Sequence, residues 1–216
     1  MGSLEAMHPS SENVPLLSLR NVTKSYGPQR VLTIDSLDLH RHERILLHGR
    51  NGFGKSTLLR ILGGISTLAG GSISRHPLLN KLRLGFLPQV GGLYADLTVR
   101  ENLHLRRQIY GLTSISPTGV WYVEELRLER YLDRRVSELS GGFQRLAGIA
   151  ATLHAAPGWL LLDEPLNGVD SKTQELLKER FAELGTRLEL CVIAAPSADG
   201  DLASTRQIEI RDGRIV

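Results

Sequence analysis

A glycine-rich segment at residues 49–57 restricts this chain to a small set of folds. It reads GRNGFGKST and fits the pattern G-x-x-x-x-G-K-[ST]. The apolar run RILLH precedes it, and KSTLLRILGG, which begins within it, has the apolar spacing and the glycine stop of a helix. A strand, a glycine turn and a helix start in this order present backbone N–H groups to an anion. The segment therefore predicts a phosphate-binding loop, or P-loop.

The P-loop is expected to hold the phosphates of a nucleotide through its backbone and two side chains. Lys55 is expected to reach the terminal phosphates, and Ser56 to ligate Mg²⁺. Only five of the 26 basic residues are lysines, so a lysine at this position by chance is improbable. The bulky Phe53 must point away from the phosphates. The expected nucleotide-binding residues of the loop are Gly49, Arg50, Asn51, Gly52, Phe53, Gly54, Lys55, Ser56 and Thr57.

A second pattern is the apolar run LLLDEP at residues 160–165, which ends in two acids and a proline. On its own it could equally be a core strand that leaves into a polar turn. In a chain with a P-loop, Asp163 is expected to hold Mg²⁺ through water. Glu164 is then placed to polarise the water that attacks the γ-phosphate.

A third pattern is LSGGFQR at residues 139–145, directly before a helical stretch. Alone it is a serine N-cap followed by two glycines, an ordinary helix start. In functional terms, Ser140 with the N–H groups of Gly141 and Gly142 makes a second anion site. Two phosphate-facing helix ends in one chain suggest a nucleotide that is shared between two copies.

The remaining pattern predicts an α/β fold with a largely parallel sheet, because apolar strand-like runs alternate with helical spacing. A mostly helical block at 90–158 interrupts this alternation. The expected strands are 16–22, 31–39, 44–49, 82–87, 159–164, 188–195, 207–211 and 213–216, and the expected helices are 55–64, 97–111, 120–132, 143–154 and 170–184.

Composition excludes several classes of protein. The chain has 216 residues of which 41% are hydrophobic, enough for a sizeable core, so disorder is excluded as its main state. Its 26 basic and 23 acidic residues nearly balance and the arginines are scattered, so no nucleic-acid partner is expected. The single cysteine, Cys191, excludes an intrachain disulfide. No apolar run approaches the ~18 residues that a membrane span requires.

The P-loop GRNGFGKST, the signature LSGGFQR and the run LLLDEP follow one another in this order along the chain. Together they resemble the nucleotide-binding domain of the ATP-binding-cassette (ABC) superfamily, from about residue 16 to 216. The resemblance implies a P-loop NTPase fold with a largely parallel core sheet, an antiparallel β subdomain and an inserted helical subdomain. It divides the chain into a flexible leader at 1–14 and one ABC ATPase domain at 15–216. The core of that domain comprises 15–88 and 159–216, and its helical subdomain 90–158.

The resemblance assigns further site residues. Tyr26, in KSYG, resembles the aromatic residue that stacks on adenine, although a lone tyrosine in a turn is more often plain packing. Gln89, in FLPQ, resembles the glutamine that contacts Mg²⁺ and links the site to the helical subdomain; it joins Lys55 and Glu164 as an expected catalytic residue. Residues 166–170, LNGVD, resemble the loop that crosses the dimer interface, with Asp170 at the acidic position.

Two positions depart from the family pattern. The fifth signature residue is Phe143 rather than glutamine, with Gln144 one place later; this is expected to be tolerated because the serine and glycines make the phosphate contact. Family members also place a histidine about thirty residues after the catalytic glutamate, and here Pro196 occupies that place. The departure implies slow hydrolysis, weak use of Ser197, or dependence on a partner ATPase with a complete site.

The expected function is that of an ATPase that uses ATP and Mg²⁺ as the cytoplasmic subunit of an exporter-type ABC transporter. Its expected partners are a second ABC subunit, in a homodimer or heterodimer, and a separate transmembrane permease subunit that holds it at the inner face of the cell membrane. Two alternatives stay open. One is a soluble ABC ATPase outside transport, and the other is a nucleotide-sensing subunit with weak turnover.

Overall fold

The computed structural model describes residues 14–198 and 203–216, which form two β-sheets with helices around them. The strands are β1 (Leu17–Tyr26), β2 (Gln29–Leu39), β3 (Glu43–His48), β4 (Gly70–Arg75), β5 (Leu84–Leu87), β6 (Trp159–Asp163), β7 (Leu190–Ala195), β8 (Arg206–Arg211) and β9 (Arg214–Ile215). A three-stranded antiparallel sheet has the order β2-β1-β4, and a six-stranded sheet has the order β5-β6-β7-β3-β8-β9. In the larger sheet all strands except β9 are parallel.

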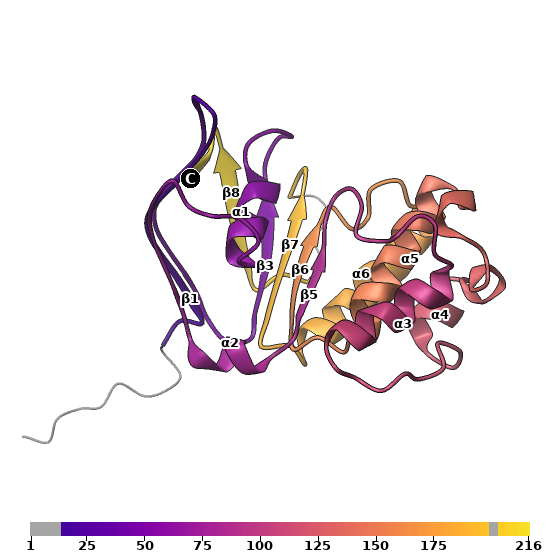
Figure 1. Cartoon of the computed structure of the whole chain (residues 1–216). Helices are drawn as coiled ribbons and strands as arrows, with labels where there is room; N and C mark the ends of the chain where they lie inside the picture. The colour runs from indigo at the N-terminus through magenta and orange to yellow at the C-terminus, as the bar shows by residue number, and fades with distance from the viewer. Residues whose placement is uncertain (1–13, 199–202) are drawn as a thin grey trace, which may run out of the picture.

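The helices are distributed unevenly around the larger sheet. They are α1 (Lys55–Leu62), α2 (Pro77–Lys81), α3 (Val99–Ile109), α4 (Trp121–Glu124), α5 (Gly141–His154) and α6 (Ser171–Gly185). Figure 1 shows α3, α4 and α5 gathered on the side of the sheet opposite β1. These three helices follow β5 and precede β6 in the chain, within the block expected to be helical. All of the expected leader except Val14 lies outside the described residues.

The two faces of the parallel sheet are covered by different parts of the chain. Leu160 and Leu162 of β6 join a core cluster with side chains of α5 and α6. Trp159 and Leu161 point the other way and join a cluster with α1 and the antiparallel sheet. Successive strand residues face opposite sides, so a strand covered on both faces needs an unbroken apolar run. The run WLLL at the start of β6 meets that requirement.

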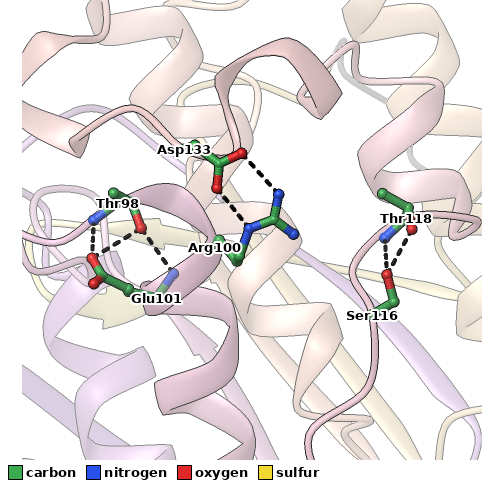
Figure 2. A network of polar contacts seen from close by, with 6 residues as sticks. All are labelled: Thr98, Arg100, Glu101, Ser116, Thr118 and Asp133. Atoms are coloured by element: carbon green, nitrogen blue, oxygen red, sulfur yellow. Dashed lines mark hydrogen bonds and ion pairs between the residues drawn. The ribbon is translucent and has the colours of Figure 1, made fainter.

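The start of α3 is fixed by polar contacts that Figure 2 shows. The Thr98 hydroxyl accepts from the Glu101 backbone N–H, and the Glu101 carboxylate accepts from the Thr98 N–H, which forms a capping box. One residue into the helix, Arg100 donates two hydrogen bonds to Asp133, at 2.7 and 2.9 Å. The beginning of α3 is thereby tied to the segment that leads into α5.

The helix expected at 120–132 was too long. Only α4 and a 3₁₀ turn at Glu129–Tyr131 form there. Arg127 between them adopts φ 56°, a left-handed conformation that ends a helix in an L-residue chain. The sequence patterns also missed β4 and α2, whose glycine-rich and short segments give no periodic signal.

His154, at the end of α5, makes folding stability depend on pH. It is buried, its Nδ1 lies 2.9 Å from the Tyr122 hydroxyl, and burial together with the charge of Arg107 lowers its pKa from 6.5 to about 4. Because the folded pKa is the lower one, the unfolded chain takes up the proton first. Stability should therefore fall as the pH drops from about 6.5 to about 4, by on the order of 3 kcal/mol.

Urea unfolding of the wild-type protein and of His154→Gln at pH 7 and pH 4.5 measures this effect. Carboxylates titrate in both proteins, so the difference between them isolates the imidazole. The variant should lose less stability over this range than the wild type. Equal losses would contradict a depressed histidine pKa.

Candidate active site

Four segments were expected to form the site. The structure places all four at one edge of the parallel sheet. β3 leads into the P-loop, β5 into Gln89, β6 into Asp163 and Glu164, and β7 into Pro196. In the registers of these strands His48 pairs with Ala195, and Asp163 with Ala194. The carboxyl ends of parallel strands meet at the same edge, so residues far apart in sequence come together there.

The backbone of the P-loop requires glycine at two of its positions. Gly49 has φ 143°, and a Cβ there would run into the backbone carbonyl of Ile210 in β8. Gly54 has φ 103° and forms the N-cap of α1, with Leu32 packed against it. Left-handed backbone and close packing together leave no room for a side chain at these positions. The expected helix from residue 55 begins where the sequence predicted.

Lys55 turns back over the loop from the first turn of α1. Its side chain is only 3% exposed, and its Nζ donates to the carbonyls of Gly49 at 2.6 Å and Arg50 at 3.3 Å. The same ammonium lies 3.6 Å from Oε1 of Glu164. The cation is thus held at the mouth of the loop, between loop carbonyls and a buried carboxylate.

Glu164 is the meeting point of three motifs. It follows β6 with φ 50°, and its N–H donates to the carbonyl of Ala194 at 3.0 Å. While Oε1 faces Lys55, Oε2 accepts a hydrogen bond of 3.0 Å from Nε2 of Gln89. The structure therefore brings the three expected catalytic side chains into one contact group.

Asp163 is a buried carboxylate whose two oxygens have no hydrogen-bond partner among the described residues. Burial raises the pKa of this group, while the Ser56 side chain acts to lower it and the Glu164 charge to raise it. Buried polar atoms are nearly always satisfied, so an unpartnered pair of oxygens points to a ligand. A carboxylate beside a serine hydroxyl suits a hard divalent cation, and these residues therefore fit Mg²⁺.

Tyr26 and Phe53 take different places around the loop. Tyr26 is 48% exposed at the end of β1. Partial burial acts to raise the pKa of its phenol, but interactions with Thr57, Ser66 and Arg60 outweigh this, so the pKa is lowered. The ring of Phe53 packs against the core, with the Arg50 guanidinium 6.0 Å from its centroid.

The signature residues begin α5. Ser140 is the N-cap and accepts from the N–H of Phe143 at 3.5 Å. A Cβ on Gly142 would lie 2.9 Å from the carbonyl of Gly168, whereas Gly141 has open space around it. Among the described residues, no hydrogen bond or ion pair joins Ser140, Gly141 or Gly142 to the P-loop. Within one chain the structure does not bring these two expected anion sites together.

A cleft of about 370 Å³ opens beside Glu164, lined among others by Asn51, Gln174, Pro196 and Ser197. Pro196 directly follows β7, so it stands at the position where the resemblance implied a histidine. Its ring carries no hydrogen-bonding group and its nitrogen no proton. Residue 196 therefore lines the cleft without supplying a hydrogen-bond donor.

Two structural roles escaped the sequence patterns. Asp170, expected at the dimer interface, is the N-cap of α6 and accepts from the Thr173 N–H at 3.1 Å. Arg145, one turn into α5, donates to the carbonyls of Pro88 at 2.6 Å and of Asp163. The role of Asp170 could have been predicted, because an aspartate directly before a helical pattern is a common N-cap. The role of Arg145 could not, because its carbonyl acceptors lie on two distant segments of the chain.

Comparison with known proteins places the chain in a family. Residues 32–167 match the ABC transporter family, which is more than half of the sequence. This chain belongs to the ABC transporter family. The expected resemblance is confirmed, and the chain is an ATP-binding cassette.

Two relatives cover the cassette differently. The Nod factor export ATP-binding protein I of Cupriavidus pinatubonensis is 37% identical over 78% of this chain and 55% of its own length, so the chain spans about half of that relative. The lipoprotein-releasing system ATP-binding protein LolD of Pseudomonas fluorescens is 32% identical over 93% of this chain and 97% of its own length.

A solved structure gives the same fold. The dimeric ATP-binding cassette MJ0796, in a post-hydrolysis state bound to ADP and Pi, has a TM-score of 0.81 at 25% identity and covers 92% of this chain and 96% of its own. The predicted fold class, a P-loop NTPase fold with a parallel core sheet, an antiparallel sheet and helices, is confirmed.

Proposed function

We propose that this cassette hydrolyses ATP as the cytoplasmic, membrane-peripheral subunit of an exporter-type ABC transporter. The observation that carries the proposal is the contact of Lys55 and Gln89 with the two oxygens of Glu164, at 3.6 and 3.0 Å, beside the P-loop. A phosphate-binding cation, a polar amide and a buried general base at one point are what the attack of water on a γ-phosphate needs. The names of the Nod factor export relatives support the exporter type.

The side chains of the site divide the work between them. Backbone N–H groups of the P-loop and the Lys55 ammonium bind the phosphates, and Tyr26 stacks on the base. Glu164 accepts the proton of the attacking water, and Gln89 orients that carboxylate through its hydrogen bond. Ser56, Asp163 and Gln89 would hold Mg²⁺, which neutralises charge on the phosphate oxygens when bound.

The Lys55 contacts also indicate what ATP does on arrival. The Lys55 ammonium contacts the carbonyls of Gly49 and Arg50 and the carboxylate of Glu164. Phosphate oxygens are stronger acceptors for an ammonium than neutral carbonyls. Bound ATP draws Lys55 toward the phosphates and releases Glu164 for its role as a base.

A second cassette completes each site in this proposal. Because no hydrogen bond or ion pair of the described residues joins Ser140–Gly142 to the P-loop of the same chain, the signature is free to face nucleotide on another subunit. Two chains arranged head to tail enclose two ATP molecules, and the dimeric state of MJ0796 supports this arrangement. The partner is either a second copy or a related cassette.

The membrane partner docks beside α3. A groove of about 270 Å³ there is lined by Gly92, Tyr94, Leu105, Arg106 and Ile109 among others. Tyr94 and Ile109 are 62% and 60% exposed, and both line this groove, so they offer apolar surface that a partner can cover. In residues 14–198 and 203–216 no helix is long and apolar enough to cross a bilayer. A short helix of a separate permease subunit is the proposed occupant of the groove.

The test is ATP hydrolysis by the purified chain, alone and with the membrane subunit that co-purifies with it. We expect turnover that the membrane subunit stimulates. Absence of turnover under both conditions would overturn the assignment as a motor.

The second candidate function is nucleotide sensing with little turnover, and Pro196 is the observation that favours it. If the missing donor limits the rate, Pro196→His should raise kcat by about tenfold or more, because an imidazole in the cleft donates a hydrogen bond to the γ-phosphate. Steady-state phosphate release measures this, with Ser197→His as the neighbouring control. An unchanged kcat in Pro196→His would mean that the site works fully without a histidine.

A further inference from the structure

Arg145 lies between the two segments that carry Gln89 and Glu164. From α5 its guanidinium donates to the carbonyls of Pro88 at 2.6 Å, Gln89 at 3.3 Å and Pro165 at 3.4 Å, and to that of Asp163. Two of these carbonyls belong to the segment after β5, one to the last residue of β6 and one to the segment that follows it. One rigid, planar group thus holds both segments at a fixed separation.

The charge of Arg145 has no direct counter-ion. Among the described residues it forms no ion pair with a carboxylate, and its donors are taken by backbone carbonyls. Burial lowers the pKa of the guanidinium, while the charges of Asp163 and Glu164 act to raise it, so both carboxylates lie within electrostatic reach. Its hydrogen bonds to four backbone carbonyls offset the cost of burying this charge, and they place the guanidinium where it fixes the two segments of the site.

The helix that carries Arg145 is also the helix that the signature begins. Ser140 is the N-cap of α5, and five residues at about 1.5 Å each put Arg145 about 7.5 Å further along the axis. From Leu146 to His154 every residue of α5 is buried, so the helix is packed against its neighbours along this whole length and resists bending. Any displacement of the signature end therefore reaches the carbonyls that Arg145 holds.

We propose that Arg145 is a positioning residue that connects the signature of this chain to its own Gln89 and Glu164. When nucleotide of a second subunit engages Ser140–Gly142, α5 shifts, and Arg145 carries the shift to the two segments whose side chains meet at the 3.0 Å hydrogen bond between Gln89 and Glu164. Each ATP site is formed by the P-loop of one chain and Ser140–Gly142 of the other. Nucleotide bound in one site thereby fixes the position of the Glu164 carboxylate in the other site. The inference rests on the proposed function, since it requires ATP shared between two chains.

The experiment compares Arg145→Met and Arg145→Lys with the wild type in the dimer with its membrane subunit. Affinity for a fluorescent ATP analogue is measured on the isolated chain, and kcat and the Hill coefficient for ATP on the complex. Lysine keeps the charge, but its ammonium is a single point of donation on a flexible stem, so it cannot reproduce the planar fork that fixes the separation of the two segments. Arg83→Met is the matched control, because within residues 14–198 and 203–216 the Arg83 side chain also donates only to carbonyls, those of Ala155 and Ala156, both at 3.0 Å and outside the site.

We expect both Arg145 variants to bind the analogue within about twofold of the wild type, to lose about tenfold in kcat and to lower the Hill coefficient toward 1. Arg83→Met should keep the wild-type Hill coefficient. A wild-type Hill coefficient and kcat in Arg145→Lys would overturn the proposal, as would the same loss of cooperativity in Arg83→Met. A wild-type complex that binds ATP without hydrolysing it would instead overturn the proposed function, so the two failures are distinct.

Discussion

Replacing Lys55 with alanine is expected to weaken ATP binding by about a hundredfold or more, which corresponds to about 3 kcal/mol. The side chain is 3% exposed, and its Nζ already sits 2.6 Å from the Gly49 carbonyl at the mouth of the loop. A charge-assisted contact to phosphate made from a desolvated position is among the stronger polar interactions in a protein. Equilibrium titration with a fluorescent ATP analogue measures the loss.

Two controls separate binding from folding in this experiment. Lys81→Ala removes an exposed lysine from α2 and should leave the affinity unchanged. Lys55→Ala also leaves Glu164 buried without its cation, which destabilises the nucleotide-free chain. In the double variant Lys55→Ala, Glu164→Gln the uncompensated charge is gone, so thermal stability should recover while ATP binding does not. Near wild-type affinity in a folded Lys55→Ala would place the phosphates elsewhere.

The P-loop was predictable because its physics is local. Gly49 and Gly54 must adopt left-handed φ, Lys55 follows at the first helical position, and all three lie within seven residues of one another. The alternation of strands and helices likewise placed Asp163 at the end of a buried strand. Local spacing and capping decide such features, and the sequence displays both.

Contacts that depend on tertiary packing were beyond the sequence patterns. Gln89 and Glu164 are 75 residues apart, and only the parallel order of β5 and β6 makes them neighbours. Arg145 binds backbone carbonyls, which every residue has. The sequence therefore contains no partner residue type from which the role of Arg145 could be predicted. The overlong helix at 120–132 failed for a related reason: the apolar spacing continued, but Arg127 turned to φ 56° where the chain packs Leu128 into the core.

Replacing Glu164 with glutamine is expected to reduce kcat by at least about a hundredfold while ATP affinity stays within about threefold of the wild type. The amide has the shape of the carboxylate and can keep a hydrogen bond to Gln89, but it cannot accept the proton of the attacking water. It also removes the negative charge that faces Lys55 at 3.6 Å, so the ammonium is freer to bind phosphate. Phosphate release under saturating ATP gives the rate.

The same variant tests the shared site. With hydrolysis blocked, ATP should stay bound between the P-loop of one chain and Ser140–Gly142 of the other, so the protein should elute as a dimer in ATP and as a monomer without it. Glu189→Gln is the matched control, because this glutamate pairs with Arg41 at 2.8 Å at the surface and away from the P-loop. A Glu164→Gln protein that hydrolyses ATP at the wild-type rate would show that another group serves as the base. Loss of turnover without an ATP-dependent dimer would support Glu164 as the base but contradict the arrangement in which two chains enclose ATP. It would then also contradict the proposed connection of two sites through Arg145.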